Sequence, residues 1–176
     1  ATPSYGIWNL YRRYGENYRS ESNEMVFKRM DKWGLNTIAN WSAAEVYELN
    51  KKAYTLGLRG LGMDGNLMGL ADVYAPDFAT NMDAAMKAYL PTNKDNPWVL
   101  GYFVGNEPSW LGQEARLCDL ILAGEARPIK AELEKYLENG DTPERKKEFI
   151  YNTFNTFLQT VKTTMKRYDP NHLNLG

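Results

Sequence analysis

The stretch that decides the fold is residues 98–104, WVLGYFV, which is apolar at nearly every position. A run of this kind is typical of a β-strand whose two faces are both covered, as in a parallel sheet. A turn signal, DNP at residues 95–97, comes just before it. We therefore expect a central strand here, in a sheet that helices cover on both sides.

Helical and strand-like patterns alternate on both sides of this stretch. Apolar residues at helical spacing predict helices at 24–33, from 42 to about 53, from 76 to about 90, and from 141 to 168. Strand-like runs lie at 35–40, 54–61 and 173–176, with a weaker one at 5–10. Residues 111–141 are predicted to form a helical insertion. Alternation of this kind, with short connections, predicts a parallel sheet built from βα units.

We interpret the fold class as α/β and the architecture as the N-terminal half of a (β/α)8 TIM barrel. It would hold strands 1–4 and the beginning of strand 5, because a strand-like run begins at 173 and a barrel needs eight units and roughly 250 residues. Residues 1–176 are then a single partial catalytic domain. An open doubly wound sheet is the alternative.

Composition excludes several classes of protein. The chain has 176 residues, with 43% hydrophobic and 24% charged residues, which is ordinary for a globular domain. A net charge of −1 gives no sign of nucleic acid or of an anionic membrane as a partner. One cysteine, Cys118, excludes an internal disulfide. We expect no cofactor and no metal, because neither a metal-ligand cluster nor a phosphate-binding glycine motif is present.

Asn106 and Glu107 follow directly on the central strand. Residues just past the carboxyl ends of parallel strands face the active site, so a carboxylate here is well placed for proton transfer. Asparagine both donates and accepts hydrogen bonds, which suits a sugar hydroxyl. The alternative is a surface glutamate in a turn before Pro108. We also expect four aromatic residues to give Glu107 an apolar environment: Trp98, Tyr102, Phe103 and Trp110.

Residues 98–110, WVLGYFVGNEPSW, resemble the fourth-strand motif of retaining β-glycoside hydrolases with (β/α)8 barrels, a clan that includes β-galactosidases and β-agarases. Other segments are similar to β-agarase-like and β-galactosidase-like members, in this order: 9–15 (NLYRRYG), 33–42 (WGLNTIANWS), 71–78 (ADVYAPDF) and 168–173 (YDPNHL). The resemblance implies that Glu107 is the general acid/base. It also implies that Asn106 binds the 2-hydroxyl of the substrate.

The resemblance further implies a mechanism and a missing residue. Retaining enzymes use two carboxyl groups about 5–5.5 Å apart, one as acid/base and one as nucleophile. In this clan the nucleophile lies on strand seven, beyond the strands expected here, and nothing marks Asp64, Asp72 or Glu114 as a substitute. We expect a glycoside hydrolase fragment for β-galactoside or agar-like polysaccharide bonds, inactive alone and secreted or periplasmic. Its partner is the missing half of the barrel or a second copy.

Further substrate-binding residues are expected at the same end of the sheet. Asn40 and Trp41 end the second predicted strand, and Trp41 and Trp110 are candidate platforms for stacking a sugar ring; buried packing is the competing interpretation for both. Asn9 is expected in the first-strand loop. His172 precedes a strand and is interpreted as structural. Two other functions stay open: a non-catalytic carbohydrate-binding or assembly half-barrel, and an unrelated barrel enzyme that carries Asn-Glu.

Overall fold

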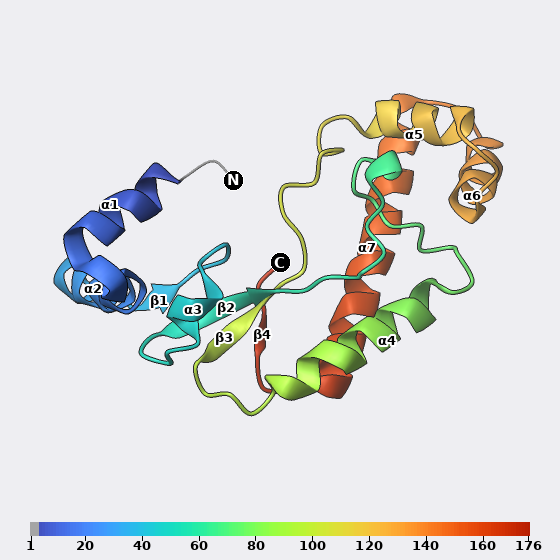
Figure 1. The fold of residues 1–176 in the computed structure, drawn as a ribbon. Coiled ribbons are helices and arrows are strands. Elements are labelled where there is room, and N and C mark those ends of the chain that lie inside the picture. The colour runs from blue at the N-terminus through green and yellow to red at the C-terminus, as the bar shows by residue number, and fades with distance from the viewer. Residues whose placement is uncertain (1–3) are drawn as a thin grey trace. The chain divides into compact units, whose positions relative to one another are not determined.

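The computed structural model describes residues 4–176 (Figure 1). Within these residues, α-helices alternate with short strands in the order α1 Tyr5–Tyr14, α2 Tyr18–Trp33, β1 Thr37–Ile38, α3 Ala44–Tyr47, β2 Ala53–Gly57, α4 Phe78–Tyr89, β3 Val99–Phe103, α5 Glu114–Ala123, α6 Pro128–Leu137, α7 Pro143–Tyr168 and β4 Leu173–Asn174. Short 3₁₀ turns lie at Gly15–Asn17, Gly65–Leu67 and Leu90–Thr92. The alternation of helices and strands predicted from the sequence is confirmed.

The strands form a four-stranded sheet in the order β1-β2-β3-β4. β1 and β2 are parallel, with Thr37 opposite Ala53. The Tyr54 amide donates to the Trp98 carbonyl and the Leu58 amide to the Phe103 carbonyl, so the partner numbers rise together, as in a parallel pair. The same holds between β3 and β4, where the Leu175 amide donates to the Tyr102 carbonyl and the Val104 amide to the Gly176 carbonyl. The predicted parallel sheet is therefore present.

The chain divides into two compact units, and the boundary passes through β2 and β3. The smaller unit holds the residues up to Leu56 together with Pro97–Gly101. The larger unit holds Gly57–Asn96 and Tyr102–Gly176. In the smaller unit, α1 packs against α2, and α3 also contacts α2.

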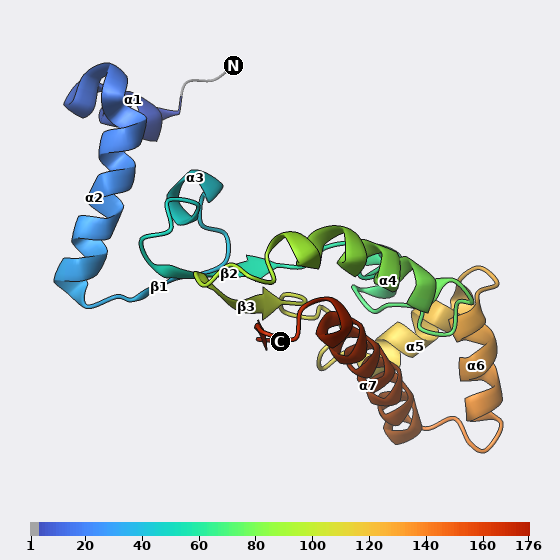
Figure 2. The same cartoon turned by 90° about the horizontal axis from the view of Figure 1, so that it is seen from below.

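The larger unit is organised around the long helix α7. Helix α4 packs against α7, and α5 and α6, the two helices within residues 111–141, pack against α7 and against each other (Figures 1 and 2). Its main apolar cluster contains Leu67, Leu70, Trp110, Leu117, Ile121, Ile129, Leu133, Phe149 and Ile150. This cluster explains why α5 and α6 form, since each helix buries one apolar stripe in it.

Two helix ends follow the sequence signals that predict them. Gly34 ends α2 in the left-handed conformation, with φ of 69°, and its amide donates to the Met30 and Asp31 carbonyls. Thr142 begins α7 by accepting a hydrogen bond from the Arg145 amide, and Pro143 occupies the first turn. The boundaries of these helices are therefore set by local chemistry.

Two sequence predictions are wrong. The weak strand predicted at 5–10 is part of α1, where the Ser4 hydroxyl accepts from the Ile7 amide and Trp8 stacks on Tyr11 one turn later. The helix predicted from 42 to 53 is the four-residue α3 only, and Ala53 already begins β2. In residues 4–176, no helix is long and apolar enough to cross a membrane.

Candidate active site at the end of strand β3

Glu107 lies in an exposed turn that begins where β3 leaves the sheet. The hydrogen bond from the Val104 amide to the Gly176 carbonyl, 2.6 Å long, holds the chain beside β4 just before the turn. Asn106 and Glu107 are both exposed. Glu107 has φ of 31°, a region that side chains other than glycine rarely occupy and that costs of order 1–3 kcal/mol. The carboxylate therefore stands in solvent on strained backbone.

The loops after β2 and β3 approach each other closely at Gly105. A Cβ at this position would lie 2.8 Å from the methyl group of Met63, which belongs to the loop after β2. Met63 itself forms an isolated antiparallel bridge with Ala71. The absence of a side chain at Gly105 therefore allows a close approach directly before Asn106 and Glu107.

The expected aromatic surroundings of Glu107 are not formed, because Glu107 is exposed and two of the four rings are buried elsewhere. Trp110 is 1% exposed, and its ring meets Tyr151 and Phe154 edge to face. Trp110 thus has no free face in this structure for a sugar ring, which matches the packing alternative. Tyr102 is fully buried and its hydroxyl binds Asp169. Trp98 precedes β3, whereas Glu107 follows it.

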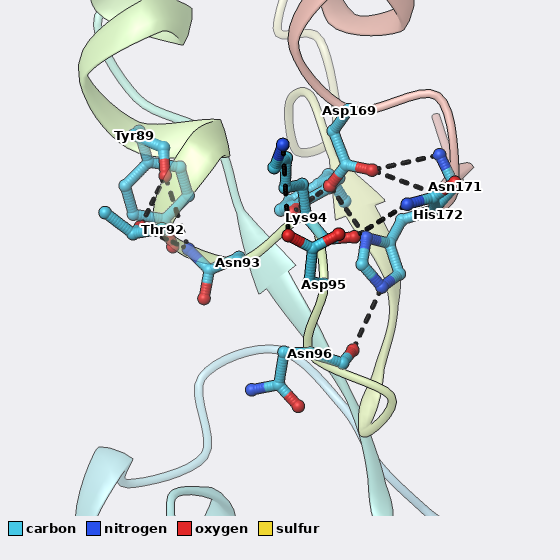
Figure 3. A network of polar contacts seen from close by, with 10 residues as sticks. Tyr89, Thr92, Asn93, Lys94, Asp95, Asn96, Asp169, Asn171 and His172 are labelled. Atoms are coloured by element: carbon cyan, nitrogen blue, oxygen red, sulfur yellow. Dashed lines mark hydrogen bonds and ion pairs between the residues drawn. The ribbon is translucent and has the colours of Figure 1, made fainter.

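A network of polar contacts lies just before β3 and β4, at the other end of the strands from Glu107 (Figure 3). The Tyr102 hydroxyl donates to Asp169 Oδ2 over 2.6 Å, and His172 Nδ1 lies 2.7 Å from the same oxygen. The amides of Asn171 and His172 donate to Asp169 Oδ1, and His172 Nε2 lies 3.1 Å from the Asn96 carbonyl. The structure thus gives His172 the structural position predicted for it. The role of Asp169 was missed, because nothing in the sequence pairs it with Tyr102.

Two opposing effects act on the pKa of Asp169, whose side chain is fully buried. Burial raises the pKa of this carboxyl, and the hydrogen bonds from Tyr102, His172 and Asn171 lower it by more. Its pKa therefore lies below the usual value. The ionised carboxylate is the form that the folded chain stabilises.

The other candidate residues belong to the smaller unit. The side-chain Oδ1 of Asn40 accepts a hydrogen bond from the Thr55 hydroxyl over 3.0 Å, which fixes the Asn40 side-chain amide just after β1. Trp41 is 85% exposed and has φ of 65°. Asn9 is exposed on helix α1, so it follows no strand, contrary to prediction. Asn106 and Glu107 belong to the larger unit.

The other acidic residues considered have structural roles. Asp64 pairs with Arg127 over 2.5 Å, and this hydrogen bond, together with one from Asn66, lowers the pKa of Asp64. Asp72 accepts from the amides of Tyr74 and Ile129, and Glu114 accepts from the Gly112 amide. Within residues 4–176 no group of three or more His, Cys, Asp or Glu side chains could hold a metal ion.

The architecture is thus that of an α/β chain with a parallel sheet and a carboxylate directly after a strand, and known proteins of this kind resemble it. Two β-agarases of Vibrio sp. (strain JT0107) match in sequence. β-Agarase B is 29% identical over 117 residues, or 60% of this chain and 12% of the relative. β-Agarase A is 33% identical over 100 residues, or 49% and 10%. No protein-family model matches. Protein adenylyltransferase SelO of Saccharomyces cerevisiae is 28% identical over 124 residues, or 69% of this chain and 18% of that protein.

Solved structures agree with the agarase relatives. The agarase AgWH50C superposes with a TM-score of 0.73 and 25% identity, covering 96% of this chain and 29% of that one. An exo-β-agarase superposes with a TM-score of 0.70 and 20% identity, with the same coverage. The chain is therefore β-agarase-like in sequence and in fold, and the resemblance predicted from the sequence is confirmed. It spans about an eighth of the length of β-agarase B.

Proposed function

We propose that this chain is part of a retaining glycoside hydrolase that cleaves β-galactosidic bonds of agar-like polysaccharides, with Glu107 as the general acid/base. The observation that carries the proposal is the placement of Glu107, exposed on strained backbone directly after β3, in a β-agarase-like chain. Strained residues persist only where the surrounding structure holds them, and they gather at functional sites.

The chemistry divides between Glu107 and a second carboxylate. In the first step Glu107 protonates the glycosidic oxygen as the bond to the anomeric carbon breaks, and the second carboxylate bonds to that carbon. In the second step the ionised Glu107 removes a proton from water, which displaces the second carboxylate. Asn106 hydrogen-bonds the 2-hydroxyl of the sugar. In the smaller unit, Trp41 stacks on a sugar ring and Asn40 contacts the polysaccharide.

The second carboxylate comes from outside residues 1–176. Asp64, Asp72 and Glu114 are engaged in structural hydrogen bonds, so none is free to attack a sugar. We place β1–β4 in the N-terminal half of a (β/α)8 barrel, in support of which this chain covers only 29% of AgWH50C. β4 is an edge strand of the sheet, and edges of this kind need covering. Further polypeptide or a second copy completes the site.

The size of the proposed substrate indicates the compartment in which the enzyme acts. A polysaccharide of high mass is degraded outside the cytoplasm, so we propose a secreted or periplasmic enzyme. The alternative function, non-catalytic binding of carbohydrate, is favoured by the 85% exposure of Trp41. The two functions differ in whether bonds are cleaved, and one experiment separates them.

That experiment uses Glu107→Gln in the longest polypeptide that contains residues 1–176, whose intact mass is measured first. New reducing ends from agarose should fall by about 10²–10⁴-fold, the usual contribution of general acid–base catalysis. An aryl β-galactoside with a good leaving group should be affected less, because it needs no protonation. Azide, which needs no base, should restore turnover of the aryl substrate as a glycosyl azide.

The matched control is Glu125→Gln, at another exposed glutamate of the larger unit, which should leave activity unchanged. Agarose cleavage that survives Glu107→Gln would refute the acid/base assignment. If the parent polypeptide binds agarose and cleaves nothing, the binding function is the correct one.

A further inference from the structure

A pocket of about 450 Å³ lies between α6, α7 and the segment that carries Tyr74, all in the larger unit. Its volume falls within the range of about 300–1,000 Å³ that is usual for ligand sites. None of residues 104–110 lines it, so it is distinct from the turn that holds Glu107. Nothing in the proposed reaction uses this pocket.

Three aromatic rings line one part of the pocket, and their positions are fixed by the protein. Tyr74 stacks on Phe149 with ring centroids 5.9 Å apart and planes 19° apart, and Tyr136 meets Phe149 at 5.5 Å. The hydroxyls of Tyr74 and Thr153 lie 3.1 Å apart. Phe149 is buried, whereas Tyr74 and Tyr136 are half-buried. Phe149 therefore supports the rings of Tyr74 and Tyr136, and these two half-buried rings give the pocket preformed aromatic surface, which the C–H face of a sugar ring matches.

Arg145 contacts Tyr136 and the segment after α6, and so stabilises one side of the pocket. Its guanidinium lies 4.4 Å from the centre of the Tyr136 ring and donates to the Tyr136 carbonyl over 2.5 Å and the Gly140 carbonyl over 3.0 Å. These contacts occupy Arg145 and hold Tyr136 in place, so its charge is already compensated by protein groups.

The charges of the pocket balance. Two acidic and two basic side chains line it: Glu132, Glu138, Lys135 and Arg145. A site for phosphate or sulfate would carry an excess of positive charge, usually with a free arginine for two parallel hydrogen bonds. Because Arg145 is occupied and the acidic residues offset the basic ones, the lining favours a neutral polar ligand.

Two amides supply the hydrogen-bonding groups such a ligand needs. Asn139, just after α6, and Asn152, on α7, line the pocket and are exposed. Their side chains have no hydrogen-bonding partner in the part of the chain that the structure describes, residues 4–176. An amide donates and accepts at once, as a pair of sugar hydroxyls does.

We propose that this pocket is a second saccharide-binding site, which takes a neutral oligosaccharide segment on the Tyr74 and Tyr136 rings and hydrogen-bonds it through Asn139 and Asn152. This site binds the polymer at a place separate from the turn that holds Glu107. Only the identity of the polymer, an agar-like galactan, rests on the proposed function; the neutral sugar chemistry rests on the pocket itself.

The test is an NMR titration of the full ¹⁵N-labelled chain with an agarose-derived tetrasaccharide, observed at the side-chain amides of Asn139 and Asn152. Both resonances should shift on binding, and an anionic oligogalacturonide of equal length should bind at least fivefold more weakly. Asn152→Ala should weaken binding of the neutral sugar at least fivefold. Asn155→Ala, an exposed asparagine on α7 that does not line the pocket, is the matched control and should not change it.

The outcomes separate this proposal from the proposed function. Glu107→Gln should leave binding at the pocket unchanged, so loss of hydrolysis with intact binding leaves the saccharide site standing. The proposal is overturned if neither amide shifts, if Asn155→Ala weakens binding as much as Asn152→Ala, or if the anionic sugar binds as tightly as the neutral one. If the pocket binds the tetrasaccharide and no polypeptide containing this chain cleaves agarose, only the hydrolase function is refuted.

Discussion

In the larger unit, the segments that precede β3 and β4 differ in almost every respect from the segment that follows β3. Before the strands, Asn96, Asp169 and His172 form a network in which the buried carboxylate accepts hydrogen bonds on both oxygens. After β3, Glu107 is exposed and its backbone is strained. One end is therefore held by buried hydrogen bonds, and the other carries the exposed glutamate that we propose as the acid/base, in line with the division between the two ends of strands expected of parallel α/β sheets.

The largest expected effect comes from removing the buried carboxylate. Asp169→Ala leaves the Tyr102 hydroxyl and the His172 ring without their shared acceptor, and each buried polar group left unsatisfied costs about 1–3 kcal/mol. Urea denaturation should show this loss in the free energy of unfolding. Asp95→Ala, at an exposed carboxylate, should change it by less than about 0.5 kcal/mol. A cost below about 1 kcal/mol for Asp169→Ala would contradict the view that buried hydrogen bonds hold the segments before β3 and β4.

A smaller effect is expected from Tyr102→Phe. This change keeps the buried ring and removes only the hydroxyl that donates to Asp169, so it should cost about 1.5–3 kcal/mol, the range for hydrogen bonds to charged groups. Thermal and urea unfolding measure it. An unchanged stability would mean that His172 and the backbone amides suffice to hold Asp169.

At the other end of the strands, a substitution should stabilise the chain. Glu107→Gly relieves the strain of a positive φ, and after the entropy that glycine adds to the unfolded chain, the free energy of unfolding should rise by up to about 1 kcal/mol. The same polypeptide should lose cleavage of agarose. Glu125→Gly, where φ is not positive, should destabilise instead. Destabilisation by both changes would show that the turn is not strained.

The smallest effect is a dependence of stability on pH. The folded pKa of Asp169 lies below that of the unfolded chain, so ionisation favours folding. This contribution is present above about pH 4, near the ordinary aspartate pKa, and is lost as the pH falls through the lower folded value. Urea denaturation between pH 6 and pH 2.5 should show a steeper acid loss for the parent than for Asp169→Asn. Parallel curves would contradict the assignment.

The elements predicted correctly from sequence are those that local chemistry decides. Residues Val99–Phe103 form β3, in which Val99 and Tyr102 are buried as expected, whereas Leu100 is 40% exposed, so the predicted cover on both faces is incomplete. Gly34 ends α2 because glycine takes the left-handed conformation there. The 5–10 segment was misread because Tyr5 and Ile7 alternate like a strand, whereas the Ser4 cap and the Trp8–Tyr11 stack favour a helix. In α1 the rings of Trp8 and Tyr11 therefore lie one helical turn apart.

The candidate site divides in the same way. Glu107 and Asn106 could be placed after the strand because the strand itself was recognisable. The burial of Trp110 could not be predicted, because it depends on Tyr151 and Phe154 of α7, more than 40 residues away along the chain. The Asp169 network and the Tyr74 pocket were missed for the same reason, since both are assembled from segments distant in sequence.

The network before β3 has a consequence for proteolysis. Asn171 donates to the Lys94 carbonyl over 2.9 Å, and His172 Nε2 lies 3.1 Å from the Asn96 carbonyl, so the peptide bonds around Lys94 are held from two sides. A protease needs this segment extended in its own cleft, so trypsin should cut after Lys94 only when the network opens. The rate of that single cut would therefore report how often this end of the sheet comes apart.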